Sequence, residues 1–447
     1  MTSETYEIPR MGELPADLQR LMERAIHSRL GVIRNLTESE PNESVPGLYT
    51  AWTRLADPYY PRTGKQSAPS ERLSAAGAGL NRVECLYSTI GESIERYAGG
   101  IYNPATLIQS SAIDLGSSAF DCEKFVLFSS EQYVDGFPYA PYDELASRAW
   151  CNATLLSGDR TTLVPAQLVY LGYKAADRAE ILTQSTSTGM ACGAEIVDVA
   201  WTGLREVIER DAFACMWALR RSPPQIAIGP ETIGLFSPGV SSILKRPELS
   251  ITVFDITTDL GVPVVFVTIR PRWGSISTVV GASAHPDPLE AASKAIVEAY
   301  HSLSWALQAK MANVTAPPAI EDISNFHHHM EFYLCKDNEP RLEFLYNSPR
   351  QSLLLSDPFQ VGDKSDQLFS MVNTLSARGY ETLFVDLTTE DVRDLSLYTG
   401  RVLVPGLQPL HAGIVNYTND TKRLAVVAEF LGVELPGTVN MDPHPFP

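Results

Sequence analysis

The sequence predicts an α+β fold in which helices that carry carboxylates pack on a mainly antiparallel sheet. Two similar helical segments, 84–96 and 198–210, stand 114 residues apart. Three β-branched segments follow at 250–257, 262–270 and 275–281, and their short, glycine-containing connection is typical of antiparallel strands. Helices before and after a group of strands indicate helices that cover a sheet.

The first two helical segments repeat one residue pattern. ECLYSTIGESIER starts at Glu84 and DVAWTGLREVIER at Asp198, and both read acid, hydroxyl, acid, acid, arginine. Because residues advance by about 100° on a helix, the hydroxyl and the two later acids share one face, opposite the apolar positions. The matched positions are Val83 and Val197, Tyr87 and Trp201, Ile90 and Leu204, and Ile94 and Ile208, with Gly79 or Gly193 ahead of each helix.

Two facing helices of this kind would gather the carboxylates of Glu92, Glu95, Glu206 and Glu209. One amphipathic helix usually exposes its charges to solvent, but the same acidic pair in the same register twice favours a shared site. Clustered carboxylates ionise together only near cations, and all-oxygen ligands suit Mg²⁺ better than zinc or copper. Mg²⁺ held by few carboxylates completes its shell with water and substrate phosphates. The residues therefore predict a magnesium–nucleotide site.

A third helix is predicted at 289–310, directly after the strands. It continues the same register with Glu290, Lys294, Glu298 and His301. Its apolar side carries Leu289, Ile296, Tyr300 and Leu303. The alternating pattern is that of a helix packed on the sheet along one face.

Composition limits the kinds of partner and compartment. The chain of 447 residues has 35 basic and 53 acidic residues, a net charge of −18, which argues against nucleic acid as a partner. The six cysteines form no CxxC pair and are expected to be reduced and mostly buried. There is no signal-peptide pattern at the N-terminus, and the longest apolar run, 261–269, is too short to span a bilayer. We expect a cytoplasmic protein without a membrane partner.

Three segments are expected along the chain. Residues 1–70 form a polar, proline-containing N-terminal segment, residues 71–310 form the nucleotide-binding core, and residues 311–447 form a C-terminal subdomain. TAPPA at 315–319 is typical of a boundary. The last residues, MDPHPFP, alternate Pro443, Pro445 and Pro447, so the tail must be extended.

Local patterns predict further elements. A helix is expected at 16–32, and Gly77 and Gly79 suggest a turn ahead of the first duplicated helix. Residues 101–180 are expected to be irregular, with a strand beginning at 164–166. Strands are also expected at 383–387 and 402–404.

Two polar segments have a less specific pattern. Residues Ser185–Gly193, STSTGMACG, form a hydroxyl-rich loop whose small residues permit close approach to a phosphate. The chain contains no GxxxxGK[ST] motif, so the nucleotide site is not a P-loop. The run His327–His329 is expected to have a structural or surface role, because adjacent residues do not face one metal together.

Several motifs together resemble the YcaO superfamily, and more closely its azoline-forming cyclodehydratases, the D proteins of thiazole/oxazole-modified peptide pathways. The resemblance covers about residues 70–447. The motifs are SxxxExxER at 88–96, STGxAxG at 187–193, LxExIERDAF at 204–213, VPGLQP at 404–409 and the terminal PHPFP.

The resemblance implies a YcaO-type fold that binds ATP and Mg²⁺ without a P-loop. The implied Mg²⁺ ligands are Glu92, Glu95, Glu206 and Glu209. The implied nucleotide contacts are Ser88, Arg96, Ser187, Asp198, Thr202 and Arg210. The family's proline tail reaches the active site, which implies a catalytic role for Pro443, Pro445 and Pro447. Deleting Phe446 and Pro447 is expected to abolish cyclisation while leaving folding intact.

The implied activity is cyclodehydration of a ribosomal precursor peptide, as in bacteriocin maturation. A Cys, Ser or Thr side chain attacks the preceding backbone carbonyl, ATP phosphorylates the carbonyl oxygen, and loss of phosphate gives thiazoline or oxazoline. Because the chain has no fused ubiquitin-activating-like domain, a separate partner of that kind is expected to bind the leader peptide. A flavin dehydrogenase acting downstream and a homodimer are also expected.

The sequence departs from the family at a few positions and leaves alternatives open. Some members have Glu and Gln at the positions of Asp198 and Thr202, many have Lys at Ala78, and Gln is common at His301. The alternatives are a YcaO enzyme that forms thioamides or macroamidines, a non-catalytic docking subunit, and a di-iron carboxylate bundle. The last would use the ExxH pair Glu298 and His301, but the other two helices carry ExxE.

Overall fold

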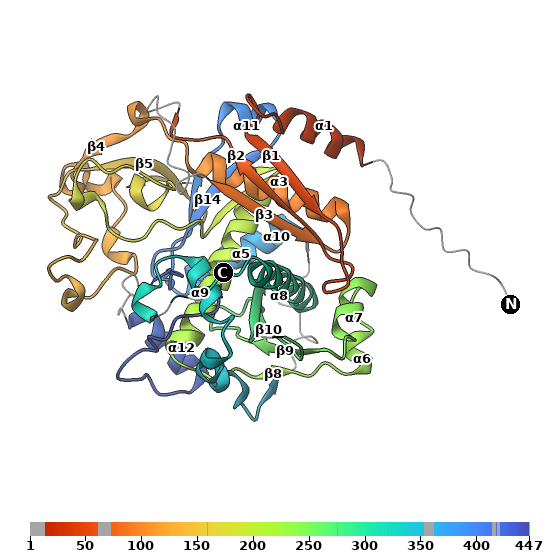
Figure 1. Cartoon of the computed structure of the whole chain (residues 1–447). Helices are drawn as coiled ribbons and strands as arrows, with labels where there is room; N and C mark the ends of the chain where they lie inside the picture. Colours follow the sequence, from red (N-terminus) through yellow and green to blue (C-terminus); the bar gives the residue numbers. More distant parts are fainter. Residues whose placement is uncertain are drawn as a thin grey trace.

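The computed structural model confirms the α+β class (Figure 1). It comprises a three-stranded sheet in the order β1-β2-β3, a five-stranded sheet in the order β11-β10-β9-β8-β12, and a six-stranded sheet in the order β4-β5-β13-β14-β7 with β6 paired to β5. All but one of the strand pairs in these sheets are antiparallel. The structure describes residues 14–60, 73–158, 160–274, 276–315, 317, 319–352, 362–413, 417 and 421–446.

The N-terminal part contains more strand and less helix than predicted. Helix α1 covers Ala16–Ala25 and ends earlier than the expected residue 32, because Ile26 is already extended. Strands β1 (Ile33–Ser39) and β2 (Tyr49–Leu55) follow, and neither was predicted. Their side chains are mixed in polarity because only one face of this small sheet is covered, by α3.

The predicted turn at Gly77 and Gly79 is wrong, since both glycines belong to strand β3 (Ser74–Gly79). Helix α3 (Arg82–Gly99) packs directly on this strand. A Cβ on Gly77 would lie 2.5 Å from the backbone nitrogen of Thr89, and one on Gly79 would lie 2.5 Å from that of Cys85. The glycines are therefore explained by the close approach of strand and helix.

The six-stranded sheet combines residues from both halves of the chain. The region 101–180 is irregular apart from short helical turns and strands β4 (Ile108–Ser110), β5 (Arg148–Leu155) and β6 (Arg160–Pro165). The strand expected to begin at 164–166 instead ends there. The predicted C-terminal strands are confirmed as β13 (Leu383–Asp386) and β14 (Tyr398–Leu403), and β14 pairs with β7 (Met190–Gly193).

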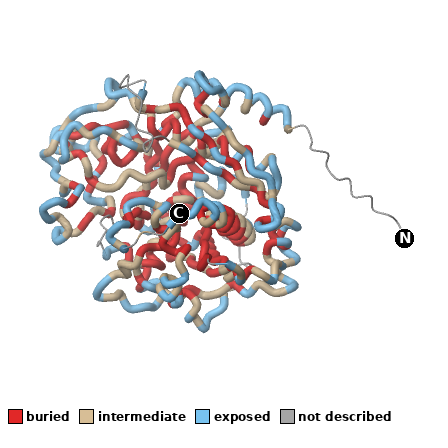
Figure 2. The backbone as a smooth tube through the Cα atoms, viewed as in Figure 1, coloured by how far each residue is buried: buried red, intermediate tan, exposed pale blue. Residues whose placement is uncertain are grey.

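The five-stranded sheet is covered on both faces, and its predicted antiparallel strands are confirmed as β9 (Leu249–Asp255), β10 (Val264–Pro271) and β11 (Val279–Ala284). Val264 and Phe266 of β10 pack with helix α5 (Ile196–Ala218), whereas Val265 and Val267 pack with helix α8 (Pro288–Met311). Double coverage explains why β10 reads as an unbroken apolar run. Figure 2 shows this buried centre, surrounded by exposed loops.

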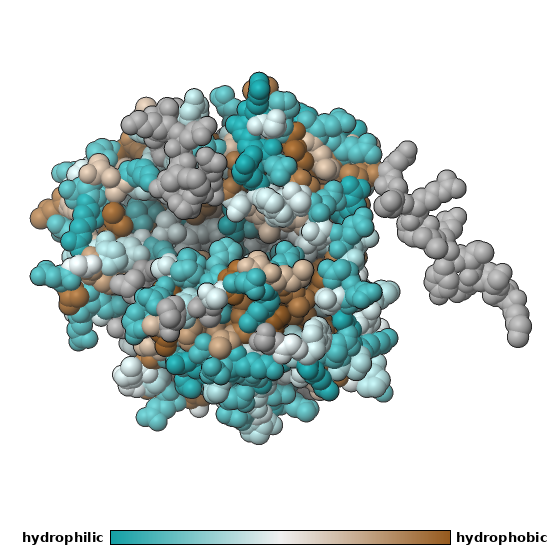
Figure 3. Space-filling model, viewed as in Figure 1, coloured by the Kyte–Doolittle hydropathy of each residue, from teal (hydrophilic) through white to brown (hydrophobic). Residues whose placement is uncertain are grey.

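Smaller elements complete the described part. They are β8 (Gln225–Ile226), β12 (Gln351–Ser352), α4 (Ala112–Leu115), α6 (Pro230–Ile233), α7 (Pro238–Leu244), α9 (Phe326–Phe332), α10 (Lys364–Ala377), α11 (Glu390–Asp394) and α12 (Lys422–Leu431). The six cysteines are free and four are buried, as expected. Hydrophilic side chains cover most of the face in Figure 3, with a hydrophobic area near its centre over α8. None of the helices in the described residues combines the length and apolar character needed to cross a lipid bilayer.

The predicted division at residues 70 and 310 stays a prediction. Strands β1 and β2 pair in one sheet with β3, across the first boundary. One hydrophobic cluster joins α5 to Phe446, across the second. Phe446 is fully buried there, so its removal is expected to lower stability as well as activity, and the expectation of intact folding is corrected.

Candidate functional site

The duplicated helices α3 and α5 enter the site in the same way. Each follows a strand, β3 or β7, that ends in a glycine. A Cβ on Gly193 would lie 2.8 Å from the Cβ of Asp198, as the corresponding Gly79 would meet the start of α3. The predicted core positions Ile90, Ile94 and Leu204 are fully buried. The repeated sequence thus gives a repeated strand–helix unit.

The four predicted carboxylates are close enough to affect one another's ionisation. Burial raises the pKa of Glu95 well above its usual value, and Glu206 and Glu92 raise it further. Burial also raises the pKa of Glu206, with a contribution from Glu92. The pKa of Glu209 rises to about 8, mainly by burial and with contributions from Glu298 and Glu206. The two helices therefore direct their acidic faces toward each other.

A fifth carboxylate, Glu298 of α8, belongs to the same cluster. Burial raises its pKa to about 7, and Glu206 and Glu92 contribute. Glu298 stands in the register of the predicted third helix, where the sequence indicates it as a ligand only in the di-iron alternative. That register was the only available signal, because nothing in the sequence shows that α8 faces α3 and α5.

Backbone N–H groups hold three of these carboxylates in place. Gly189 donates to Oε2 of Glu206 over 3.1 Å. In β11, Ala282 donates to Oε2 of Glu298 over 3.2 Å and Ala284 donates to Oε2 of Glu209 over 3.3 Å. Each carboxylate keeps its second oxygen for another partner, so these bonds orient the groups without using up their capacity to bind a cation.

Arginines supply the positive charge of the site. Arg96 pairs with Glu92 over 2.7 Å, and Arg210 lies 3.5 Å from Glu206 and 3.3 Å from Glu209. Arg401 of β14 was not predicted. It is 5% exposed, and burial lowers its pKa to about 10 although Glu206 and Glu95 act in the opposite direction. No sequence signal identified Arg401, since a single arginine in a strand has no distinguishing pattern.

The other predicted nucleotide contacts lie around the cluster. Ser88 and Thr202 are exposed, one helical turn before Glu92 and Glu206. Ser187 is half-buried in the loop that precedes β7. Asp198 forms an ion pair of 2.5 Å with Lys364 of α10. These four roles stay predictions, and the structure brings together the glutamates and arginines rather than the hydroxyl residues.

The C-terminal tail runs antiparallel to α5 toward Arg210. Trp217 donates through Nε1 to the carbonyl oxygen of Asp442 over 2.8 Å. Four residues further along, Phe446 contacts Phe213, with 4.8 Å between ring centroids, and the Arg210 guanidinium lies 4.3 Å from the centroid of Phe446. Pro443 and Pro445 are buried, whereas Pro447 lies outside the described residues. The extended tail predicted from the prolines is confirmed up to Phe446.

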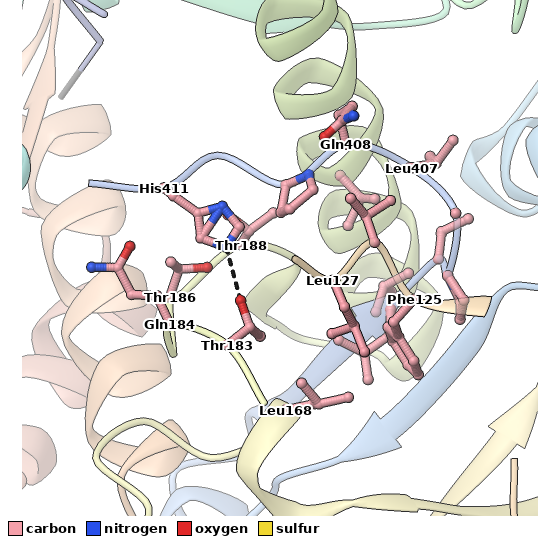
Figure 4. A pocket seen from close by; sticks show the side chains of 18 of the residues that line it. Phe125, Leu127, Leu168, Thr183, Gln184, Thr186, Thr188, Leu407, Gln408 and His411 are labelled. Carbon is pink, nitrogen blue, oxygen red and sulfur yellow. Dashed lines mark hydrogen bonds between the residues drawn. The ribbon is translucent and has the colours of Figure 1, made fainter. Parts of the chain in front are cut away.

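A cavity of about 110 Å³ lies next to the cluster (Figure 4). Arg401 and Val207 line it, together with residues 402–409 and the hydroxyl-rich loop. Figure 4 shows His411 at the cavity, where its Nε2 lies 3.0 Å from Oγ1 of Thr183. The VPGLQP and STG motifs therefore meet on one side of the carboxylates.

The donor set fits Mg²⁺. All five clustered acidic groups offer oxygen, and the raised pKa values of Glu95, Glu206, Glu209 and Glu298 reflect burial and a charge density that a divalent cation would relieve. In the part of the chain that the structure describes, no three acidic, His or Cys side chains already converge as a coordination sphere.

Solved structures with the same fold were found. A heterocyclase in complex with substrate and cofactor matches with a TM-score of 0.76 and 21% identity, covering 98% of this chain and 58% of that chain, so this chain spans little more than half of its length. YcaO from Methanopyrus kandleri bound with AMPPCP and Mg²⁺ matches with a TM-score of 0.63 and 18% identity, covering 91% and 95%. The E. coli microcin synthetase McbBCD complex with pro-MccB17 bound matches with a TM-score of 0.60 and 16% identity, covering 92% and 96%.

Sequence comparisons give a family. An uncharacterised protein of Methanothermobacter thermautotrophicus is 25% identical over 346 residues, which are 74% of this chain and 81% of that protein. The family model described as YcaO cyclodehydratase, ATP- and Mg²⁺-binding, matches residues 76–408. That range contains all five clustered glutamates and most of the chain. The protein therefore belongs to the YcaO cyclodehydratase family and binds ATP and Mg²⁺.

Proposed function

We propose that this protein is an ATP-dependent peptide cyclodehydratase that converts Cys, Ser or Thr residues of a ribosomal precursor peptide to thiazolines or oxazolines. The observation that carries the proposal is the cluster of five carboxylates and Arg210, with the C-terminal tail ending against Arg210. Family membership supports the nucleotide chemistry, and the buried tail supports the azoline-forming branch of the family.

The acidic residues would hold the cation and the arginines would hold phosphate. We assign Glu92, Glu95, Glu206 and Glu209 as Mg²⁺ ligands and add Glu298, which faces the same cluster. When bound, Mg²⁺ supplies positive charge that neutralises the carboxylates and the phosphates of ATP. We propose that Arg96, Arg210 and the unpredicted Arg401, which lie beside the carboxylates, contact phosphate oxygens.

The proposed reaction removes one carbonyl oxygen from the peptide backbone. The thiol or hydroxyl of the reacting residue loses its proton and adds to the carbon of the preceding carbonyl. The former carbonyl oxygen takes the γ-phosphoryl group of ATP and ADP is released. The nitrogen then loses its proton as a C=N bond forms, and phosphate leaves with the oxygen. Binding energy from the rest of the peptide would position the reacting carbonyl.

The tail is proposed to shape the site rather than to bind metal. Pro443 and Pro445 keep it extended, and its last described residue, Phe446, covers one side of Arg210. A guanidinium that lies on an aromatic ring keeps its N–H groups free for acceptors in its own plane, so Phe446 would orient Arg210 toward phosphate.

Partners are proposed from the comparisons. The microcin synthetase neighbour is a complex that was solved with pro-MccB17 bound. The heterocyclase neighbour is longer than this chain. We propose that a separate ubiquitin-activating-like protein presents the leader peptide, that a flavin dehydrogenase acts on the product, and that the chain forms a homodimer in the cytoplasm. Bacteriocin maturation is the proposed setting.

The test is mass spectrometry of precursor peptide incubated with this protein, the partner, ATP and Mg²⁺. Each azoline should lower the peptide mass by one water, and Glu206→Gln should abolish both this loss and ATP hydrolysis. Thioamide formation would instead exchange oxygen for sulfur. Macroamidine formation would also lose water, but it would persist when the core Cys, Ser and Thr residues are replaced by Ala. A docking subunit would hydrolyse no ATP, and Glu206→Gln would change nothing.

A further inference from the structure

His329 connects α9 to two segments near the proposed active site. It is the last residue of the run His327–His329 and is 1% exposed. Its Nδ1–H donates to the carbonyl oxygen of His444 over 2.8 Å, and its Nε2 accepts from the N–H of Gly413 over 2.9 Å. A carbonyl can only accept and an N–H can only donate, so the two bonds define one neutral tautomer of His329.

His444 is held by further contacts of its ring and its backbone. Its ring stacks on His329 with 4.0 Å between centroids, and its Nε2–H donates to the carbonyl oxygen of His411 over 2.8 Å. Its backbone N–H donates to the hydroxyl of Tyr417 over 3.2 Å. His411 also lines the cavity beside the carboxylates. The tail is therefore fixed to the 411–413 segment two residues before Phe446.

The network requires neutral rings. Burial lowers the pKa of His329 to about 4 and, together with His329, lowers that of His444 well below 6.5. The other titratable or charged groups that face the pair are His411, Tyr417, His328 and Arg210. No carboxylate is among the causes that shift either pKa, so in this described neighbourhood His329 stays free to accept from Gly413.

We infer that His329 is a positioning residue that sets where the tail ends. By joining the carbonyl of His444 to the N–H of Gly413, it fixes the tail between α9 and the cavity segment and so holds Phe446 against Arg210. This inference rests on the proposed function, in which the tail shapes the site. His329 acts through the tail, and its effect should fall on the step in which Arg210 contacts the transferring phosphoryl group more than on the binding of ATP.

The test compares His329→Leu, which removes both hydrogen bonds, with His329→Gln, whose amide can both donate and accept. His328→Leu, a neighbour on the same helix, is the matched control. We expect His329→Leu to accelerate hydrogen exchange of the amides in 440–446 by at least about tenfold and to lower kcat for cyclisation by about 100-fold. The KM for ATP should stay within about twofold, His329→Gln should recover most of both losses, and His328→Leu should resemble wild type.

Several results would overturn this role. Unchanged hydrogen exchange of the tail amides together with an unchanged kcat in His329→Leu would do so. A His329→Gln variant that recovers neither quantity relative to His329→Leu would also do so. If His329→Leu does not fold, His329→Gln is compared with His329→Asn, whose side chain is too short to reach both partners. Equal hydrogen exchange of the tail amides in these two variants counts against the inference. Because the exchange measurement needs no reaction, it decides the role of His329 even if the wild-type protein forms no azoline.

Discussion

Raising the pH from about 6.5 to about 8 without divalent cations is expected to lower the free energy of unfolding of the wild-type protein relative to that of the double variant Glu209→Gln with Glu298→Gln. Glu209 and Glu298 have folded-state pKa values of about 8 and about 7, raised from 4.5 mainly by burial. Between 4.5 and these values the folded protein binds more protons than the unfolded chain. Stability from these groups is therefore present below pH 4.5, is lost progressively as the pH rises above 4.5, and the loss is complete above the folded pKa values.

The size of the loss follows from the same shifts. Each pKa unit corresponds to about 1.4 kcal/mol, and both groups titrate in part across this window. Solvent reaches part of the cluster, where the side chain of Glu206 is 26% exposed, so we expect a loss of about 2 kcal/mol after screening. Groups with lowered pKa values act in the opposite direction across this window. The unfolded forms of His285, His301, His329 and His411 are still half protonated at pH 6.5, and burial lowers the pKa of Lys294 to about 8. The loss is therefore measured relative to a variant that lacks the two carboxylates.

The assay is urea denaturation at both pH values, with and without Mg²⁺ and a non-hydrolysable ATP analogue. Ligands that bind only the folded, ionised cluster should restore the lost stability at pH 8 and have a smaller effect at pH 6.5. A double variant, Glu209→Gln with Glu298→Gln, should lack this loss. A difference in unfolding free energy between wild type and this variant that stays constant from pH 6.5 to pH 8 would refute the reasoning.

Three further predictions concern single side chains. Glu298→Gln should reduce ATP hydrolysis by about 100-fold in a phosphate-release assay, because it removes one charge from the proposed Mg²⁺ site, while Glu290→Gln on the exposed first turn of α8 should have no effect. Phe446→Ala should cost about 3 kcal/mol in denaturant titrations, since it empties a fully buried position, and Phe446→Leu should cost less. Arg423→Met should cost about 3–5 kcal/mol because it leaves buried Asp211 without its 2.7 Å partner, and adding Asp211→Asn should recover part of that loss.

The duplicated helices were predictable because their pattern is local. Helical periodicity separates apolar from acidic positions, and Ile90, Ile94 and Leu204 are buried as expected. The equivalence of the two helices fails at one pair. Tyr87 is 39% exposed and donates to Asp17, whereas Trp201 is 6% exposed. The same position faces α1 in one repeat and α10 in the other, and that difference depends on packing that no local pattern contains.

The remaining site residues were not predictable, because each reaches the cluster through a non-local contact. Glu298 was visible as part of a helical register, but only the packing of α8 on β11 brings it opposite α3 and α5. Arg401 reaches the site because β14 pairs with β7, more than 200 residues earlier in the chain. The histidine run was expected to be structural or on the surface. The burial of His329 against the tail confirms the structural alternative for that residue, though its partners come from two distant segments.

The geometry of the cluster is set by the sheets more than by the helices that carry it. Glu206 is oriented by Gly189, just before β7, while Glu209 and Glu298 are oriented by alternate residues of one strand, Ala284 and Ala282. Alternate residues of a strand direct their N–H groups to the same edge, so β11 holds two carboxylates from different helices at a fixed spacing. A shift of β11 along its neighbour would move both glutamates together, which keeps their separation constant for a bound cation. The duplicated sequence therefore supplies the charges, and an unduplicated strand supplies the spacing between two of them.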